Sequence, residues 1–462
     1  MEPVHSFAAR DVRSVIHPFT DLAHHVEEGP LVLSRGDGVY VLDEHGRRYL
    51  EGMAGLWCAN LGFSEARLVE AAREQMTRLP TYHLFGGKSH APAIALAERL
   101  LALAPAPMSK VLFTCSGSEA NDTALKLVRY YHHAIGKPGK RKVISRVRAY
   151  HGVTLACASL TGLPHAHRDF GLPLPGILHV GCPHHYRCAL PDETEEAFAA
   201  RLAAELEHLI QQEGPDTVGA FIAEPVMGAG GVLVPPATYF EQIQAVLQKY
   251  DVLLIADEVI TGFERTGATF GCDRFGIEPD LITIAKGLSA GYMPIGGVLI
   301  SERIYQAMLE QSRKIGTFGH GFTYSGHPVG AAVALRALEI YQEDDIAGQV
   351  VAAAPHFAAR IAELATHPLV GHGRAIGLIG AIELMADLDQ KMPFDPTLKV
   401  GAQVAEWALE YGVILRPLGD ILSFCPPLII NRAEIDFLFD AVSRALDRVA
   451  SELKDEHRRK VA

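Results

Sequence analysis

The chain has 462 residues and a formal net charge of −12, from 42 Lys and Arg against 54 Asp and Glu. This acidic balance argues against nonspecific binding to nucleic acid or to an anionic membrane surface, which needs a basic face. Hydrophobic residues make up 48%, as in ordinary globular proteins, and the length predicts a large domain with a smaller one.

The beginning of the chain predicts no targeting segment. Residues 1–21 lack the apolar core of a secretory signal peptide, and no apolar run of membrane-spanning length follows. The seven cysteines are scattered through apolar contexts, which indicates a reducing compartment rather than a disulfide framework. We therefore expect a cytoplasmic protein.

The first strand-like pieces lie in residues 29–52, "GPLVLSRGDGVYVLDEHGRRYLEG". Turn residues at 36–38 and 44–46 predict two strands there. We expect this segment to pack with the C-terminal part of the chain.

The middle of the chain alternates short apolar runs with helix-like stretches. The strand candidates are 110–117, 141–147, 218–226, 251–259, 281–287 and 295–301, and helical patterns cover 117–136 and 195–214. This alternation predicts an α/β fold with a mostly parallel sheet covered by helices on both faces. Ligands of such sheets collect at the carboxyl ends of the strands.

The pattern changes after about residue 330. A strong helix (330–342) precedes two strand-like runs within 372–386, and a final helix begins near Asn431. These elements predict a separate α+β domain. We divide the chain into an N-terminal segment (1–57) that packs with the small domain and the active-site entrance, a large domain (58–328) and a C-terminal small domain (329–462).

The stretch "FTCSGSEANDTALKLV" predicts a strand, a tight turn and a helix. Ser116, Gly117 and Ser118 let backbone N–H groups approach an anion at the helix N-terminus, so they form a candidate phosphate site. The stretch is neither a Walker motif nor GxGxxG. The alternative is an ordinary capped helix with Ser118 as its N-cap.

Two charged residues end neighbouring apolar strands. Asp257 ends "LLIAD", and Lys286 ends "LITIAK" about one βαβ step later, so parallel pairing would bring both to one sheet edge. A desolvated lysine is a nucleophile able to form a Schiff base. The small residues after it would leave room for a ligand. The alternatives are a capping aspartate and a lysine that reaches the surface.

Tyr150 and His151 follow the strand at 141–147, where an aromatic ring can stack on a flat ligand or simply pack in the interior. The four features together match pyridoxal 5′-phosphate (PLP). Its phosphate needs an anion site, its ring needs stacking, its pyridine nitrogen needs a carboxylate, and its aldehyde needs a lysine.

The motifs "TCSGSEAND", "YHG", "EPVMGAGG", "ADEVITGFERTG", "AKGLSAGYMPIGG" and "HGFTYSGHP" resemble class III PLP-dependent aminotransferases of fold type I. "HPFTD" (17–21) and "GMAGLWCANLG" (52–62) are similar to the ω-transaminases, or amine:pyruvate aminotransferases. The resemblance covers nearly the whole chain.

The resemblance implies roles around the cofactor. Lys286 would carry PLP and Asp257 would pair with its pyridine nitrogen. The remaining cofactor-binding residues that we expect are Ser116, Gly117, Ser118, Tyr150, His151, Glu224, Val259 and Thr323. Thr323 would reach the phosphate in a partner subunit's site, so a homodimer, or a tetramer built of dimers, is implied.

The resemblance also implies a substrate pocket. Arg416 would take the substrate carboxylate, and the apolar walls would come from Phe19, Trp57, Phe85 and Tyr150. The alternatives are an interdomain salt bridge for Arg416 and ordinary core packing for Trp57. The family usually has glycine at the position of Glu264, and bulkier residues at Gly86-Gly87, so the preferred amine stays open.

We therefore predict a transaminase that moves an amino group from a primary amine or ω-amino acid to a keto acid such as pyruvate. The alternatives are another class III PLP enzyme, an aminomutase or racemase, or a noncatalytic PLP-binding protein. "CPHHYRC" (182–188) fits no standard zinc spacing, and we expect no metal site.

Overall fold

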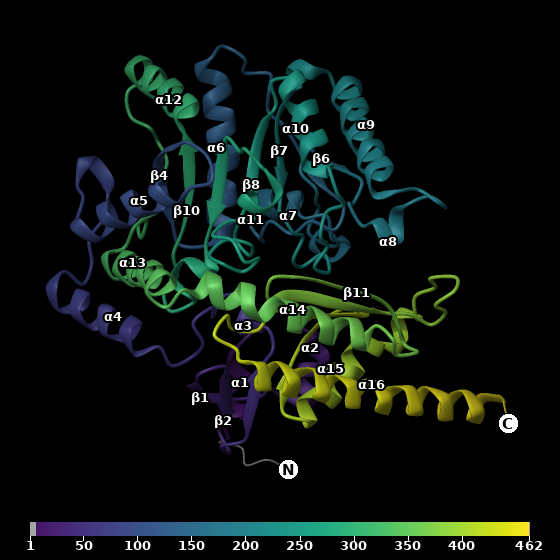
Figure 1. Cartoon of the computed structure of the whole chain (residues 1–462). Coiled ribbons are helices and arrows are strands. Elements are labelled where there is room, and N and C mark those ends of the chain that lie inside the picture. Colours follow the sequence, from purple (N-terminus) through teal and green to yellow (C-terminus); the bar gives the residue numbers. More distant parts are fainter. Residues whose placement is uncertain (1–5, 462) are drawn as a thin grey trace.

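The computed structural model describes residues 6–461, with side chains for 6–455. A seven-stranded sheet forms the upper half of the molecule in Figure 1. In spatial order its strands are β4 (Met108–Thr114), β10 (Gly296–Ser301), β9 (Leu281–Ile284), β8 (Leu253–Asp257), β7 (Val218–Ala223), β5 (Lys142–Arg146) and β6 (Ile177–Val180). The five strands from β9 to β6 are parallel, and β10 is antiparallel to both neighbours, so the predicted mostly parallel sheet is confirmed.

Helices cover both faces of this sheet because its strands are apolar on both sides. Alternate residues of β8 show the pattern: Leu253 and Ile255 pack with α6 and α12, whereas Leu254 and Ala256 belong to the larger core on the opposite face. The helices of the large sheet are α5 (Ala91–Leu103), α6 (Gly117–Ala134), α7 (Leu155–Leu160), α9 (Glu195–Glu213), α10 (Tyr239–Lys249), α11 (Gly271–Phe275), α12 (Glu302–Ile315) and α13 (Pro328–Glu343).

The N-terminal segment and the C-terminal part of the chain lie together in the lower half of Figure 1. Residues 29–52 form three strands, β1 (Leu33–Asp37), β2 (Tyr40–Asp43) and β3 (Arg48–Glu51), where the sequence indicated two. The third strand pairs in parallel with β13 (Val413–Ile414). The expected packing of the N-terminal segment with the C-terminal part is therefore confirmed, while the proposed boundaries at 57/58 and 328/329 stay a prediction.

The C-terminal part contains a second small sheet packed against long helices. Its order is β11 (Val370–Ile376), β12 (Ile379–Leu384), β15 (Ile421–Phe424) and β14 (Arg416–Leu418). Helices α14 (Ile346–Leu364), α15 (Val400–Glu410) and α16 (Arg432–Val461) lie with it, and α16 follows the lower side of the molecule (Figure 1).

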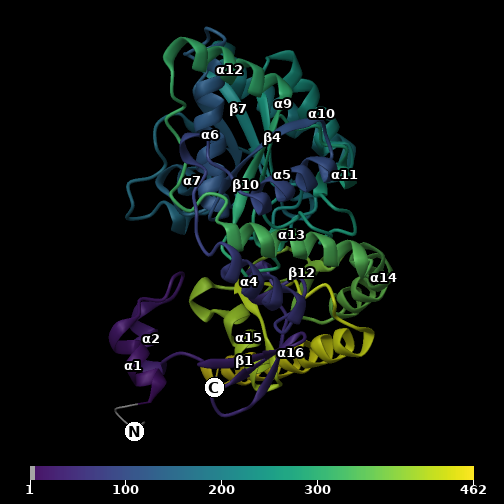
Figure 2. The ribbon, with the colours of Figure 1, turned by 90° about the vertical axis from the view of Figure 1, so that its left-hand side faces the viewer.

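The remaining helices lie in the N-terminal segment and in the connections. They are α1 (Phe7–Ser14), α2 (Leu22–Glu28), α3 (Ala54–Trp57), α4 (Ala66–Arg78) and α8 (His185–Cys188). Figure 2 shows α1 and α2 beside the rest of the chain rather than within it. No helix within residues 6–461 is long and apolar enough to cross a membrane.

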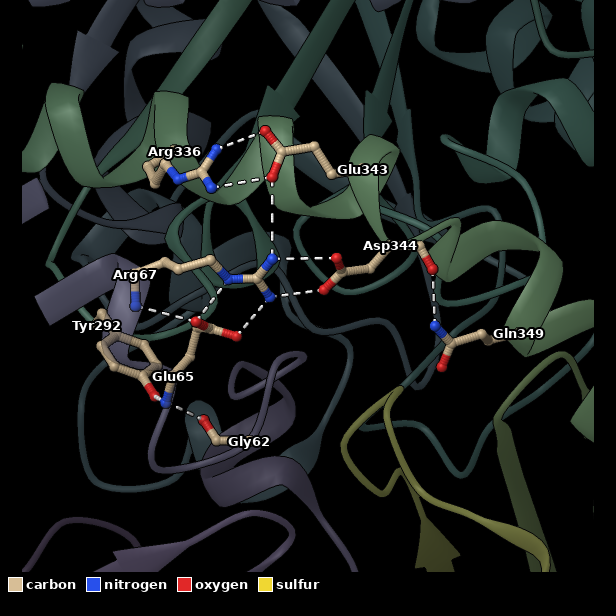
Figure 3. A network of polar contacts seen from close by, with 8 residues as sticks. All are labelled: Gly62, Glu65, Arg67, Tyr292, Arg336, Glu343, Asp344 and Gln349. Atoms are coloured by element: carbon tan, nitrogen blue, oxygen red, sulfur yellow. Dashed lines mark hydrogen bonds and ion pairs between the residues drawn. The ribbon is translucent and has the colours of Figure 1, made fainter. Parts of the chain in front are cut away.

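A polar network fixes the loop that follows Lys286 (Figure 3). The hydroxyl of Tyr292 accepts a hydrogen bond from the N–H of Glu65 (2.7 Å) and donates one to the carbonyl of Gly62 (3.2 Å). Glu65 also accepts a hydrogen bond from Arg67. The guanidinium of Arg67 donates two more to Asp344, to Oδ1 at 3.0 Å and to Oδ2 at 2.6 Å. These ion pairs are half exposed, so they contribute more to position than to stability.

Candidate active site

Asp257 and Lys286 lie at the same edge of the large sheet. Asp257 is the last residue of β8, and Lys286 follows the last residue of β9 by two positions. The two strands are parallel neighbours in a register that sets Asp257 beside Thr283. The sequence prediction that strand pairing brings these two residues to one edge is confirmed.

The carboxylate of Asp257 is buried and held by three donors. Its Oδ2 accepts hydrogen bonds from Asn121 Nδ2 and His151 Nδ1, both at 2.7 Å, and its Oδ1 accepts a longer one from the N–H of Val259 (3.2 Å). The residue is only 3% exposed. Asn121 and His151 thus fix the orientation of the carboxylate and leave Oδ1 as the oxygen with capacity for a further donor.

Lys286 is a half-buried residue whose amine lies near the carboxylates of Asp257 and Glu224. Burial lowers the pKa of its ammonium, and the negative charge of Asp257 acts against that effect. The residue has a left-handed backbone conformation, with φ of 46°. Such a conformation costs of order 1–3 kcal/mol in a non-glycine residue and persists where the surrounding structure enforces it.

The small residues after Lys286 do not leave open space, contrary to our expectation. A β-carbon at Gly287 would lie 2.6 Å from Nδ2 of Asn60, and one at Gly291 would lie 3.1 Å from Sγ of Cys58. Their missing side chains admit neighbouring parts of the protein, which pack against the loop and hold Lys286 in place.

The candidate phosphate site begins helix α6, and its N-cap is Ser116 rather than Ser118. The Oγ of Ser116 accepts a hydrogen bond from the N–H of Glu119 at 3.2 Å. Ser118 instead accepts one from the N–H of Val153, also at 3.2 Å. Both serines and Gly117 therefore sit at the positive end of α6, where free N–H groups favour an anion.

Two glycines permit the close approach of three loops at this point. A β-carbon at Gly117 would lie 3.0 Å from Cγ1 of Val259, and one at Gly152 would lie 2.4 Å from Oγ of Ser118. Gly152 also has φ of 124°, a conformation that requires glycine. The loops at 116–118, 150–153 and 257–259 are thereby brought into direct contact.

Glu224 positions Tyr150 near the same sheet edge. Its Oε1 accepts a hydrogen bond from the N–H of Tyr150 (3.0 Å), and its Oε2 accepts one from the N–H of Gly228 (2.9 Å). Burial raises the pKa of this carboxyl, while His151 nearby lowers it. Its contact is with the backbone that carries the tyrosine.

Four side chains from distant parts of the chain form a cluster that we call the mouth: Phe19, Tyr150, His165 and Arg416. The ring of Phe19 lies edge-on to Tyr150 at 6.3 Å and to His165 at 6.0 Å between centroids. The guanidinium of Arg416 lies 5.7 Å from the centroid of Phe19. Burial lowers the pKa of Arg416, partly offset by Tyr150.

The other three predicted residues lie outside these contacts. Trp57 is buried with Met53, Ile260 and Cys425 in a small core cluster. Phe85 is 49% exposed and lies against Gly321, and Thr323 is exposed on the same surface loop. The ring and cation contacts that form the mouth involve neither Phe85 nor Thr323.

Sequence reasoning missed Asn121 and His165. Asn121 lies one turn after Gly117 in α6 and faces the strand end that carries Asp257, so its position in "SEAND" was an available signal. His165 lies in a connecting loop, in η2 (Pro164–Ala166), and reaches the mouth only through the fold. No local pattern could have indicated it.

The residues present fit PLP. One lysine amine of lowered pKa, one buried carboxylate with a free acceptor position, and a helix N-terminus with small residues meet at one sheet edge. Tyr150 and Val259 lie beside it on the loops that the two glycines bring together. This donor set provides one group for each polar part of the cofactor.

The profile of the family "Aminotransferase class-III" matches residues 22–446. "Gamma aminobutyrate transaminase 3, chloroplastic" from Solanum lycopersicum is 49% identical over 445 residues, which are 95% of this chain and 86% of the relative. A thermostable omega transaminase mutant from Pseudomonas jessenii is 53% identical with a TM-score of 0.95, covering 96% of this chain and 98% of its own. The omega transaminase of the same organism solved in complex with PMP is 52% identical, with the same TM-score and coverage.

These matches span almost the whole chain at about half identity. The structure places a lysine, an aspartate and a helix N-terminus at one sheet edge, which is the arrangement that PLP requires. The chain belongs to the class III aminotransferases, PLP-dependent enzymes of fold type I that transfer amino groups.

Proposed function

We propose that the enzyme transfers the amino group of a primary amine or an ω-amino acid to a keto acid, with pyruvate as the acceptor. The observation that carries this proposal is that Arg416 is half buried without a carboxylate partner among the described residues. Its guanidinium is half buried in the mouth, stacked on Phe19, and forms no ion pair with any carboxylate among residues 6–455. A desolvated cation without a counter-ion is costly, so a substrate carboxylate would complete the site.

The mouth also suits an amine that lacks a carboxylate. Arg416 is held there by one aromatic contact and by no ion pair with a described residue, so few interactions oppose its displacement. The interdomain salt bridge that we considered for this residue is absent among residues 6–455.

The relatives named as gamma-aminobutyrate transaminases make 4-aminobutyrate a second candidate donor.

The sheet edge would carry the chemistry. Bound PLP supplies an aldehyde that condenses with amines and a ring that takes up an electron pair. Lys286 would hold the aldehyde, and its amine, once freed, would move a proton at the substrate carbon. Asp257 would keep the ring nitrogen protonated through its negative charge. The phosphate would lie at Ser116, Gly117 and Ser118, and the ring between Tyr150 and Val259.

We also propose that the enzyme is a homodimer and that each active site lies at the interface between its two subunits. Phe85 and Tyr324 are large exposed side chains at 49% and 65%, and the loop that carries Tyr324 touches Phe85 through Gly321. Exposed apolar residues on adjoining loops are typical of a surface that another chain covers. Thr323 of this loop would reach the phosphate of the partner's site.

A mixing experiment tests the shared site. Lys286→Ala and Thr323→Asp variants are each expected to be inactive, and subunit exchange between them should restore part of the activity, because one site in the mixed dimer has both residues intact. Absence of recovery in exchanged dimers that mass spectrometry verifies would contradict the shared site.

A donor and acceptor panel tests the reaction. Pyruvate is paired with β-alanine, 4-aminobutyrate, putrescine, taurine and an aromatic amine, and alanine formation is measured. Alanine should appear only when both substrates are present. Isomerisation of a single substrate would instead support an aminomutase or racemase, and PLP binding without turnover of any pair would support a noncatalytic protein.

The proposed compartment is the cytoplasm. All seven cysteines are free, which suits reducing conditions. Fractionation of the source cells tests this assignment.

A further inference from the structure

Three metal-binding side chains meet in the N-terminal segment, outside the active site. Asp11 comes from α1, His25 from α2, and His17 from the connection between these helices. Oδ1 of Asp11 lies 2.8 Å from Nε2 of His17 and 3.3 Å from Nε2 of His25, and the three atoms lie within 4.8 Å of one another. Residues from three positions thus direct their ligand atoms to one point.

The donor set and its spacing suit Zn²⁺. Zinc in proteins is bound tetrahedrally by imidazole nitrogens and carboxylate oxygens, and ligand atoms in such a site are about 3.4 Å apart. Asp11 is 23% exposed and His17 is 32% exposed, so one side of the cluster is open to water as a fourth ligand.

His25 provides an independent indication of a missing partner. Its side chain is only 8% exposed, and its Nε2 has no hydrogen-bond partner, because the nearby Asp11 oxygen lies outside hydrogen-bonding geometry. A buried polar atom without a partner is costly, and most such atoms are satisfied by a group, a water or an ion. The unpartnered nitrogen faces the other two ligand atoms.

A second histidine cluster in the chain lacks this character. His184 and His372 lie near Glu383, but that carboxylate is held by Arg187 at 2.7 Å and by Arg374 at 3.1 Å. Arg374 also contacts Nδ1 of His372 at 2.9 Å. Two guanidinium groups repel a divalent cation, so this cluster, which includes part of "CPHHYRC", is an ion-pair network. In the first cluster the Asp11 carboxylate lies beside two imidazole nitrogens instead.

We propose that Asp11, His17 and His25 bind one divalent transition-metal ion, with Zn²⁺ as the best-fitting species. The sequence predicted no metal site, because the three residues show no standard spacing and converge only in the folded segment.

The site also has a consequence for the mouth. His17 is two residues before Phe19, so a bound ion would fasten the connection that carries this ring over Arg416. That consequence, unlike the metal site, rests on the proposed function.

Zinc binding to the full-length, PLP-loaded enzyme tests the site. The protein is stripped with EDTA, dialysed, and titrated with ZnCl₂ against a chromophoric chelator. One tight site per chain is expected in the native protein. His17→Ala and Asp11→Asn should weaken it by more than about 100-fold, because each removes a ligand. His25→Ala should weaken zinc binding equally. Because His25 is buried, its loss could also disturb the fold, so the more exposed His17→Ala tests the same ligand set without that risk.

Matched controls separate this site from adventitious binding by the 22 histidines. His24→Ala changes an exposed neighbour of His25, and His184→Ala changes the second cluster. Both should retain the tight site. Equal zinc affinity in the native protein, His17→Ala and Asp11→Asn would overturn the proposal, as would the absence of any tight site.

Limited digestion with chymotrypsin tests the consequence for Phe19. Zinc should slow cleavage after Phe19 in the native protein and leave the rate unchanged in His17→Ala. This readout does not depend on transamination, so zinc binding with a failed donor panel would overturn the proposed reaction alone. Zinc binding without protection from cleavage would contradict only the proposed effect of the metal on Phe19.

Discussion

The sheet edge around Asp257 and Lys286 and the mouth around Phe19 and Arg416 are built by different contacts. At the edge, paired parallel strands and three hydrogen bonds hold the carboxylate. At the mouth, aromatic contacts join residues almost 400 positions apart, and Arg416 pairs with no described carboxylate. Proton transfer needs fixed geometry, whereas specificity tolerates parts that move.

The largest effect is expected at the edge, from Lys286→Ala. Turnover of any donor with pyruvate should fall by about 10⁴-fold or more, because the amine that moves the proton is removed. Alanine formation measures the loss, and circular dichroism checks the fold. Normal turnover by this variant would refute the assignment of Lys286.

Asp257→Asn should reduce turnover by about 10²–10³-fold, because a neutral amide no longer favours a protonated ring nitrogen. Asp251→Asn is the matched control: Asp251 precedes the amino end of the same strand and pairs with Lys137 at the surface. If both variants lost equal activity, the special role of the carboxyl end would be wrong.

Arg416→Ala should act on the mouth alone. The kcat/KM for pyruvate should fall by about 10²-fold, because two charge-assisted hydrogen bonds are lost. The half-reaction with an amine that lacks a carboxylate should change by less than about threefold. Arg444→Ala, which removes another arginine stacked on an aromatic ring, should change neither rate.

A pH effect should appear at Glu51, whose carboxylate accepts hydrogen bonds from the N–H groups of Met53 and Gly55 before Trp57. Burial raises its pKa to about 8. A raised folded-state pKa gives stability that is present below the unfolded value of 4.5 and is lost as the pH rises through 8. The melting temperature of Glu51→Gln relative to the native protein should therefore rise by about 2–5 °C between pH 5 and pH 9.

Glu70→Gln, at an exposed carboxylate paired with Arg73, serves as the control for this measurement. A pH profile of Glu51→Gln that runs parallel to the native one would show that Glu51 does not titrate in this range.

The smallest effect is expected at Glu264, where the resemblance leads us to expect glycine. Glu264 has φ of 74°, the residue is 8% exposed, and burial raises the pKa of its carboxyl. Glu264→Gly should stabilise the protein by about 1 kcal/mol, measured by denaturant unfolding, because it relieves the left-handed conformation. Glu264→Ala keeps that conformation, so equal stabilisation by both variants would assign the gain to loss of the buried carboxyl.

The sequence alone determined that Asp257 and Lys286 lie at the same edge of the sheet. Strand ends are local features, so an apolar run that stops at Asp257 or Lys286 indicates where each side chain emerges, and the alternation of strands and helices indicates that both emerge together. The turn at 116–118 is equally local. Its N-cap was assigned to the wrong serine because several residues of the same type compete for that position.

Only the tertiary structure decided the rest. His151 reaches Asp257, and His165 joins Phe19 and Tyr150, through contacts that no spacing along the chain encodes. The cluster of Asp11, His17 and His25 likewise exists only when α1 and α2 pack. Local patterns fix where a side chain leaves its element, but the energy of packing whole elements fixes which side chains meet.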